Sequence, residues 1–247
     1  MTKPWQFHFR KHSYVFKVKI GFFVLCFMLF SLCLALGVWQ LHRYANKKTL
    51  LATYHARLHG APLAFAKLTH AHDLQFQSVF VEGQYLNQFT MFVQNRFYHD
   101  ALGYEVLTPL HILRDKKLLL VDRGWVPKPP DKSLPSIQNT DGMQQVKGYI
   151  KVLDEYQFIL GKNILQDQLT PLVMQKIDMN EISRVLQQSF YPFILRLDAS
   201  QSHGFVRDWI ITTMLPERHM AYAVQWFLLA IVLCIAYFCF CCERTNE

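Results

Sequence analysis

The residues best suited to chemistry lie at the start of the second of two apolar runs in this sequence. Arg218 and His219 directly precede a charge-free run at 220–242. Residues three, four and seven apart share one face of a helix. The face that begins at the histidine holds His219, Tyr222, Ala223, Trp226 and Ala230. An imidazole can ligate a metal and a guanidinium can pair with an anion, but the same residues suit the polar and aromatic rim of a membrane helix. The spacing leaves both interpretations open.

A similar group stands at the end of the first apolar run. Trp39 closes that run and His42 follows it. If both runs cross a membrane, Trp39 and His42 lie at about the same depth as His219. His42 is therefore the second candidate ligand, and Trp39 is a candidate aromatic contact.

Another candidate lies between the two runs. In the predicted strand 117–126, Arg123 shares a face with Leu119 and Val121, because side chains alternate along a strand. An arginine on an apolar face requires an acceptor. That acceptor is either an internal carboxylate such as Glu105 or an external anion.

Other clusters of polar residues give weaker indications of a functional site. The THAHD segment places His70, His72 and Asp73 in a short polar loop with no further ligand nearby, so we interpret it as a solvated loop rather than a metal site. Neither a GxSxG elbow nor an HExxH helix is present, and no glycine-rich phosphate loop occurs. The sequence therefore predicts a protein that is not an enzyme.

All six cysteines fall in the apolar runs, so the central segment is expected to fold without disulfides; they are Cys26, Cys33, Cys234, Cys239, Cys241 and Cys242. We interpret the group near the end of the second run as small apolar side chains rather than a soft-metal site.

Both apolar runs are long enough to cross a membrane. Ile20–Trp39 has no charged residue for 20 positions, and the second run has none for 23. At about 1.5 Å per residue, each reaches roughly 30 Å, the thickness of a hydrocarbon core. A cleaved signal peptide is the alternative for the first run, but its apolar part would span only about 7–15 residues. We therefore predict transmembrane helices at 20–39 and 219–242.

Charge predicts the orientation of these helices. The first 19 residues hold five basic side chains and no acid, and such flanks stay in the cytoplasm. We expect cytoplasmic tails at 1–19 and 243–247, a periplasmic domain at 40–218, and a location in the bacterial inner membrane. The central segment has 20 basic and 16 acidic residues, a balance too mild to predict nucleic-acid binding.

Strand patterns dominate the central segment. Stretches rich in β-branched and aromatic residues lie at 78–86, 89–98, 103–113, 116–127, 144–153, 172–179 and 190–199. Short connections at 86–88 and 114–116 predict antiparallel hairpins, and 178–188 predicts a helix capped by Asp178 or Asn180. The first helix is expected to continue beyond the membrane until Pro62. The predicted fold is a membrane protein whose two transmembrane helices flank a mainly antiparallel β (α+β) extracytoplasmic domain.

Four patches together carry a family resemblance. They are 36–47 with Gly37, Trp39, Gln40 and Arg43; 80–127 with Asn95, Arg96, Gly103 and VDRGWVP; FYPFILRLD at 190–198; and PERHMAYAVQWFLLA at 216–230. With the two-helix layout, the chain resembles the Surfeit locus protein 1 family of cytochrome c oxidase assembly factors. The resemblance spans most of the chain from Leu36 to Ala230, and its specificity comes from the combination of patches.

The resemblance implies a role in making the haem–copper oxidase. The family is associated with haem a and its delivery to, or stabilisation in, oxidase subunit I; haem a synthase is a further candidate partner. Bacterial members resemble haem a binders whose proposed ligand is a histidine at the start of the second transmembrane helix, which here is His219. The resemblance therefore implies transient haem a binding with His219 as the axial iron ligand. Arg218 or Arg123 would then pair with a propionate, and the small side chains of Ala223 and Ala230 would leave room for the flat macrocycle.

We interpret the chain as a membrane-anchored oxidase assembly factor that acts by binding. One alternative is a cofactor-free two-helix membrane scaffold or sensor whose external domain binds another envelope protein. The other is a membrane redox enzyme that uses haem for electron transfer.

Overall fold

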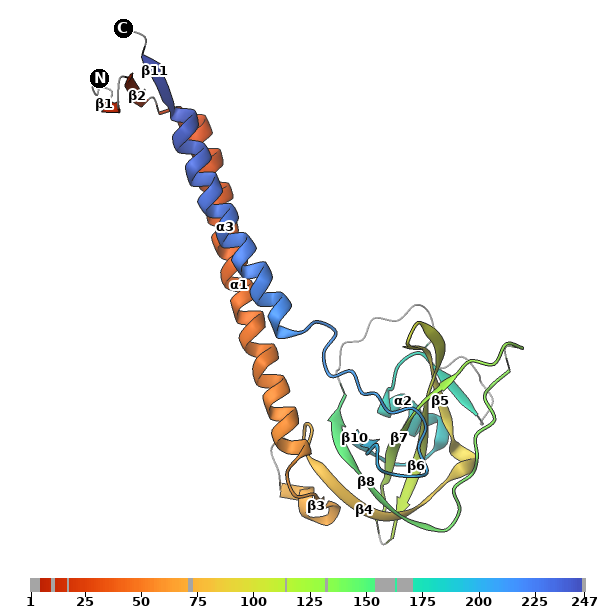
Figure 1. The fold of residues 1–247 in the computed structure, drawn as a ribbon. Coiled ribbons are helices and arrows are strands. Elements are labelled where there is room, and N and C mark those ends of the chain that lie inside the picture. The colour runs from red at the N-terminus through yellow and green to blue at the C-terminus, as the bar shows by residue number, and fades with distance from the viewer. Residues whose placement is uncertain are drawn as a thin grey trace. The chain divides into compact units, whose positions relative to one another are not determined.

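The computed structural model describes residues 5–9, 12–16, 18–70, 73–113, 115–131, 133–153, 163 and 171–245 (Figure 1). The chain divides into two compact units. Residues 1–52 and 210–247 form a helical unit, and residues 53–209 form a β-rich unit.

Two long helices make up most of the helical unit: α1 (Ile20–Leu58) and α3 (Pro216–Cys241). Both are long and apolar enough to cross a membrane. Helix α1 begins at the predicted residue and continues well beyond Trp39, as predicted. Helix α3 begins at Pro216, before the predicted start, because the fixed φ and missing N–H of proline suit the first turn of a helix.

Small side chains line the packing between these helices. The buried residues of α1 are Cys33 and Gly37, and those of α3 include Ala223 and Ala230. A Cβ atom on Gly37 would lie 2.6 Å from the ring of Phe227, so glycine is what allows that ring to lie against α1. Small residues let helix backbones approach closely in membranes.

A short sheet accompanies the ends of the chain. Strands β1 (Trp5–Phe9), β2 (His12–Phe16) and β11 (Cys242–Thr245) pair in the antiparallel order β1-β2-β11. No strand was predicted in these segments from the sequence.

Each predicted strand stretch contains an observed strand. The strands of the β unit are β3 (Leu63–Ala64), β4 (Ser78–Tyr85), β5 (Met91–Tyr98), β6 (Ala101–Ile112), β7 (Leu118–Pro127), β8 (Met143–Val152), β9 (Leu172–Met174) and β10 (Phe190–Leu197). Short 3-10 helices occupy Phe65–His70 (η1) and Asn87–Phe89 (η2). Helix α2 (Met179–Leu186) begins after Asp178, whose carboxylate accepts from the N–H groups of Asn180 and Glu181, as predicted for its cap.

The central strands close into a barrel. The sheet order is β3-β4-β8-β10-β7-β6-β5-β9, and an additional pairing of β4 with β6 joins β4, β8, β10, β7 and β6 in a ring. Most pairs are antiparallel, as predicted, but β10 pairs with β7, β3 with β4 and β5 with β9 in parallel. Five-stranded barrels of this general kind include the OB-fold, which by itself does not indicate a function.

One of the two predicted hairpins is wrong. The connection at 114–116 joins the antiparallel pair β6 and β7, as predicted. The connection at 86–88 instead separates β4 and β5, which lie one after the other along the same long strand, β6: Met91 pairs with Leu107 and Tyr85 with Leu110. A twelve-residue strand is long enough to pair with both.

Apolar clusters cover both faces of the barrel wall. Inside, the cluster draws on every barrel strand, with residues such as Val81, Leu110, Val121, Ile150 and Leu195. On the opposite face, a second cluster packs against β9 and α2. Side chains on either face of β7 therefore pack against an apolar cluster.

Candidate functional site

His219 is a buried polar residue in the apolar packing of the helix pair. It lies in the first turn of α3 and is 9% exposed. Its Nδ1 lies 2.8 Å from Oε1 of Gln40 on α1. Its Nε2 is also buried and has no hydrogen-bond partner among the described residues. An imidazole with one nitrogen held and the other free is able to ligate a metal.

The helix face of α3 that begins at His219 separates into a buried part and an accessible part. Ala223 and Ala230 are fully or almost fully buried in the helix pair together with His219. Tyr222 is 42% exposed and Trp226 is half-buried. Since the alanines contribute to helix packing, they leave no open shelf for a flat group, and only the aromatic side of this face is accessible.

The remaining predicted residues of the helical unit are exposed. Trp39 is 49% exposed, with the guanidinium of Arg43 5.5 Å from its ring, and His42 and Arg218 are exposed as well. His42 follows Gln40 by two residues, which is about 200° around a helix of 3.6 residues per turn. Because Gln40 contacts His219, the structure does not bring the two candidate histidines together.

Arg123 belongs to the β unit and is only 2% exposed. It donates from Nε and Nη2 to the carbonyl oxygen of His203, at 3.0 and 2.9 Å, and from Nη2 to the hydroxyl of Thr140 at 2.9 Å. Its Cζ lies 5.1 Å from the ring of Tyr85 and 5.0 Å from that of Phe205. The acceptors are internal, but they are a backbone carbonyl and a hydroxyl, so the expectation of an internal carboxylate such as Glu105 was wrong. Burial lowers the pKa of Arg123.

A backbone feature explains why these acceptors were missed. The N–H of Phe205 donates to the carbonyl of Arg123, and Trp125 donates to Val206, so the segment before α3 pairs with the end of β7. Gly124 lies between them with a φ of +116°, and a Cβ there would lie 2.5 Å from the oxygen of Val206. That close approach brings the distant His203 carbonyl to Arg123, a contact that strand alternation cannot reveal.

Sequence reasoning also missed a buried charge network on the outer face of the barrel. Arg196 lies 3.5 Å from Oδ2 of Asp122 and 3.9 Å from Oε1 of Glu105, and Glu105 also pairs with Arg96 at 3.2 Å. Asp122 is fully buried, and burial together with the nearby carboxylate of Glu105 raises its pKa to about 7. The guanidinium of Arg196 also lies 4.5 Å from the ring of Trp209. The signal was available, because arginine within FYPFILRLD needs a partner wherever the strand is buried.

Asp73, the last residue of the THAHD segment, forms an ion pair. Asp73 contacts Arg57 at 2.8 Å, and that pairing lowers its pKa. The side chains of His70 and His72 lie outside the described residues. Among the residues the structure describes, no group of three or more His, Cys, Asp or Glu side chains is arranged to hold a metal ion.

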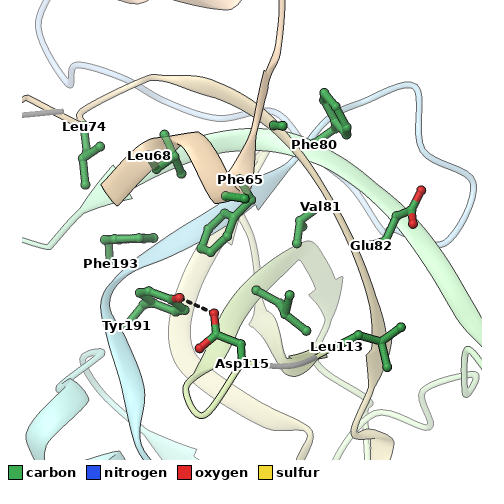
Figure 2. Close-up of a pocket in the computed structure, with 13 residues that line it drawn as sticks. Phe65, Leu68, Leu74, Phe80, Val81, Glu82, Leu113, Asp115, Tyr191 and Phe193 are labelled. Atoms are coloured by element: carbon green, nitrogen blue, oxygen red, sulfur yellow. Dashed lines mark hydrogen bonds between the residues drawn. The ribbon is translucent and has the colours of Figure 1, made fainter. Parts of the chain in front are cut away.

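A cavity of about 700 Å³ opens in the β unit, and none of the predicted site residues lines it. Most of its lining is apolar, from η1, β4, the end of β6 and the start of β10. Figure 2 shows the rings of Phe65, Tyr191 and Phe193 around this cavity, and the hydroxyl of Tyr191 donates a hydrogen bond to Asp115. Such a lining suits an apolar ligand or side chain, and sequence patterns gave no sign of it because its residues come from four separate segments.

Comparisons with known proteins show a family. The profile of the SURF1 family matches residues 27–231, a range that includes every predicted site residue. A SURF1-like protein of Rickettsia conorii is 27% identical over 220 residues, covering 86% of this chain and 88% of its own. One of Dictyostelium discoideum is 23% identical and covers 87% and 94%. The cytochrome oxidase assembly protein SHY1 of Saccharomyces cerevisiae is 28% identical over 135 residues, covering 53% of this chain and 33% of its own.

Proposed function

Because the chain belongs to the SURF1 family, we propose that it is a membrane-anchored assembly factor for cytochrome c oxidase. A yeast relative is named as a cytochrome oxidase assembly protein. The two apolar helices provide the membrane anchor. In our proposal the protein holds haem a transiently and assists its insertion into oxidase subunit I, acting by binding and release; haem a synthase is a further candidate partner.

The observation that carries the haem proposal is the buried Nε2 of His219. It lies in an apolar helix packing and has no hydrogen-bond partner among the described residues. A buried polar atom without a partner costs free energy unless a ligand satisfies it. Neutral imidazole is a common axial ligand of haem iron, so the residue fits the group that the family implies.

Further residues of the helical unit are assigned to the same site. Arg218 is exposed beside His219 and would pair with a propionate. Tyr222, Trp226 and Trp39 offer exposed or half-exposed aromatic surface for the macrocycle. We leave Arg123 out of the cofactor site, because its guanidinium is almost fully buried and donates to His203 and Thr140.

We also propose that both termini are cytoplasmic and the β unit is periplasmic, in the inner membrane of a bacterium. The basic, acid-free start of the chain supports this orientation, and Rickettsia proteins are among its relatives. Alkaline phosphatase fused after Lys128 should be active, and the same reporter fused after Glu247 should be inactive. The reverse pattern would overturn the orientation.

Deletion of the gene tests the function. Membranes should then contain less assembled oxidase, and subunit I should be short of haem a while haem a synthesis continues. In a complemented strain, His219→Ala should insert and fold but retain little haem, whereas His42→Ala should behave as the parent. Normal oxidase and haem a content after deletion would instead support the cofactor-free scaffold, for which the apolar cavity of the β unit offers a docking surface.

A further inference from the structure

We infer that Gln40 is a positioning residue, which holds the imidazole of His219 with Nδ1 protonated and Nε2 free to bind iron. The inference rests on the proposed function, in which His219 is the haem ligand. Nothing in the family resemblance assigns a role to this glutamine.

The contact between the two side chains selects the tautomer. The Oε1 atom of Gln40 is a carbonyl oxygen and only accepts hydrogen bonds. At 2.8 Å from Nδ1 of His219, it requires that Nδ1 carry the proton. A neutral imidazole has a single ring proton, so the lone pair that can ligate a metal is on Nε2.

The surroundings of Nε2 are consistent with the same tautomer of His219. Among the described residues, Nε2 of His219 has no partner and is buried, so no second hydrogen bond competes for the tautomer. The helix packing that carries the contact is also specific: Gln40 lies one turn beyond Gly37, where a Cβ would clash with Phe227. That close approach of α1 and α3 fixes the distance over which the glutamine reaches the histidine.

The arrangement matches a general feature of metal-binding histidines. Such histidines usually donate their second ring N–H to a carbonyl or carboxylate, which fixes the orientation of the ring. Loss of that acceptor typically lowers metal affinity by about 10–100-fold. A neutral amide oxygen in this position orients the ring without adding a charge inside the apolar packing.

Titration of the detergent-solubilised, full-length protein with haemin tests the inference. Gln40→Leu removes the acceptor at similar size and should weaken haemin binding by about 10–100-fold. Gln40→Glu keeps an acceptor oxygen and should bind within a few-fold of the parent, with a more negative reduction potential, because a carboxylate makes the imidazole more electron-rich. Gln225→Leu is the matched control, since Gln225 is an exposed glutamine on α3, and should bind as the parent does.

The outcomes separate the inference from the proposed function. Unchanged affinity and absorption spectrum in Gln40→Leu would overturn the positioning role, as would a Gln40→Glu variant as weak as Gln40→Leu. If His219→Ala binds haemin with the parent's affinity and spectrum, the ligand assignment fails, whatever Gln40 does. Equal unfolding curves for the helix pair in all variants, followed by circular dichroism in increasing SDS, would show that lost binding reflects the site rather than misfolding.

Discussion

The helical unit and the β unit bury polar groups in different ways. Between α1 and α3, the packing is made of small and apolar side chains, and the contact of Gln40 with His219 stands out in it. The β unit buries Asp122 and Arg196 at 0% and 7% exposure and connects them to Glu105 and Arg96. Within the described chain, the helical unit buries an unpaired histidine nitrogen among apolar side chains. The β unit buries charges beside one another, and some of its buried atoms, such as Nη1 of Arg123, also have no hydrogen-bond partner among the described residues.

This difference bears on which buried polar groups stabilise the fold and which are available to a ligand. Charges that are paired inside a domain are retained because removal of one partner strands the other. A free nitrogen in an apolar helix packing gives no such benefit to the fold, and polar residues in membrane helices are usually functional. The position of His219 in the apolar packing of two membrane helices is therefore what makes it the candidate ligand of our proposal.

Removal of Arg196 should have the largest effect on stability. Arg196→Leu leaves Asp122 buried without its cation and removes the contact with Trp209, so we expect a loss of about 3–5 kcal/mol in the free energy of unfolding. Urea unfolding followed by tryptophan fluorescence measures it. Arg96→Leu is the control, because Arg96 is about one-third exposed, and its loss should cost about 1 kcal/mol. Equal losses in the two variants would mean that the network is not a buried structural element.

The pH dependence of stability should reveal the buried acid. The pKa of Asp122 is raised from 3.8 to about 7 in the folded chain. Between those values the folded state holds a proton that the unfolded state has released, so this group's contribution falls as the pH rises from about 4 to about 7 and is constant above. The slope is at most about 1.4 kcal/mol per pH unit.

Asp122→Asn isolates this contribution. The amide cannot titrate. The unfolding free energy of the parent should therefore fall steadily relative to that of the variant as the pH rises from 4 to 7. Urea titrations at intervals across this range provide the measurement. Parallel curves would show that Asp122 does not hold the proton.

Gly37→Leu should disturb the helix pair alone. The new side chain would meet the ring of Phe227, and overpacking typically costs about 1–3 kcal/mol. Unfolding of the helices in increasing SDS, followed by circular dichroism, should shift to lower detergent, while urea unfolding of the β unit stays unchanged. Phe227→Ala in the same chain should relieve part of the loss. A shift of the β unit would contradict the independence of the two packings.

The smallest effect is expected at a polar group near the surface. Asp178→Ala removes the cap of α2, which should cost about 1 kcal/mol. The same urea titration measures it, with Asp178→Asn as the control that retains a capping oxygen. A loss of unfolding free energy as large as that of Arg196→Leu would contradict the expectation that buried polar groups contribute more to stability than polar groups near the surface.

Local features of the fold were predictable from the sequence, and contacts between distant segments were not. The start of α1, its continuation to Leu58 and the cap of α2 depend on neighbouring residues, and the prediction was confirmed for each. The order of the strands depends on closure, so the pairing of β4 with β6 was missed.

The candidate site shows the same division. The residue types at the head of α3 made His219 a candidate, but its partner lies 179 positions away in the chain. Alternation correctly placed Arg123 on the face of the interior cluster, beside Tyr85. It gave no information on the His203 carbonyl, which is a backbone group brought in by a loop.

The closed ring of strands also determines when the β unit can fold. Strand β10 pairs with both β7 and β8, so the barrel remains incomplete until residues 190–197 have been synthesised. Until then β7 and β8 each present an unpaired edge, and such edges promote association with other chains. Pairings between segments far apart in sequence also form slowly. Protection of the nascent domain is therefore needed most after β8 has emerged and before β10 has, and a chain that stops between them should aggregate rather than fold.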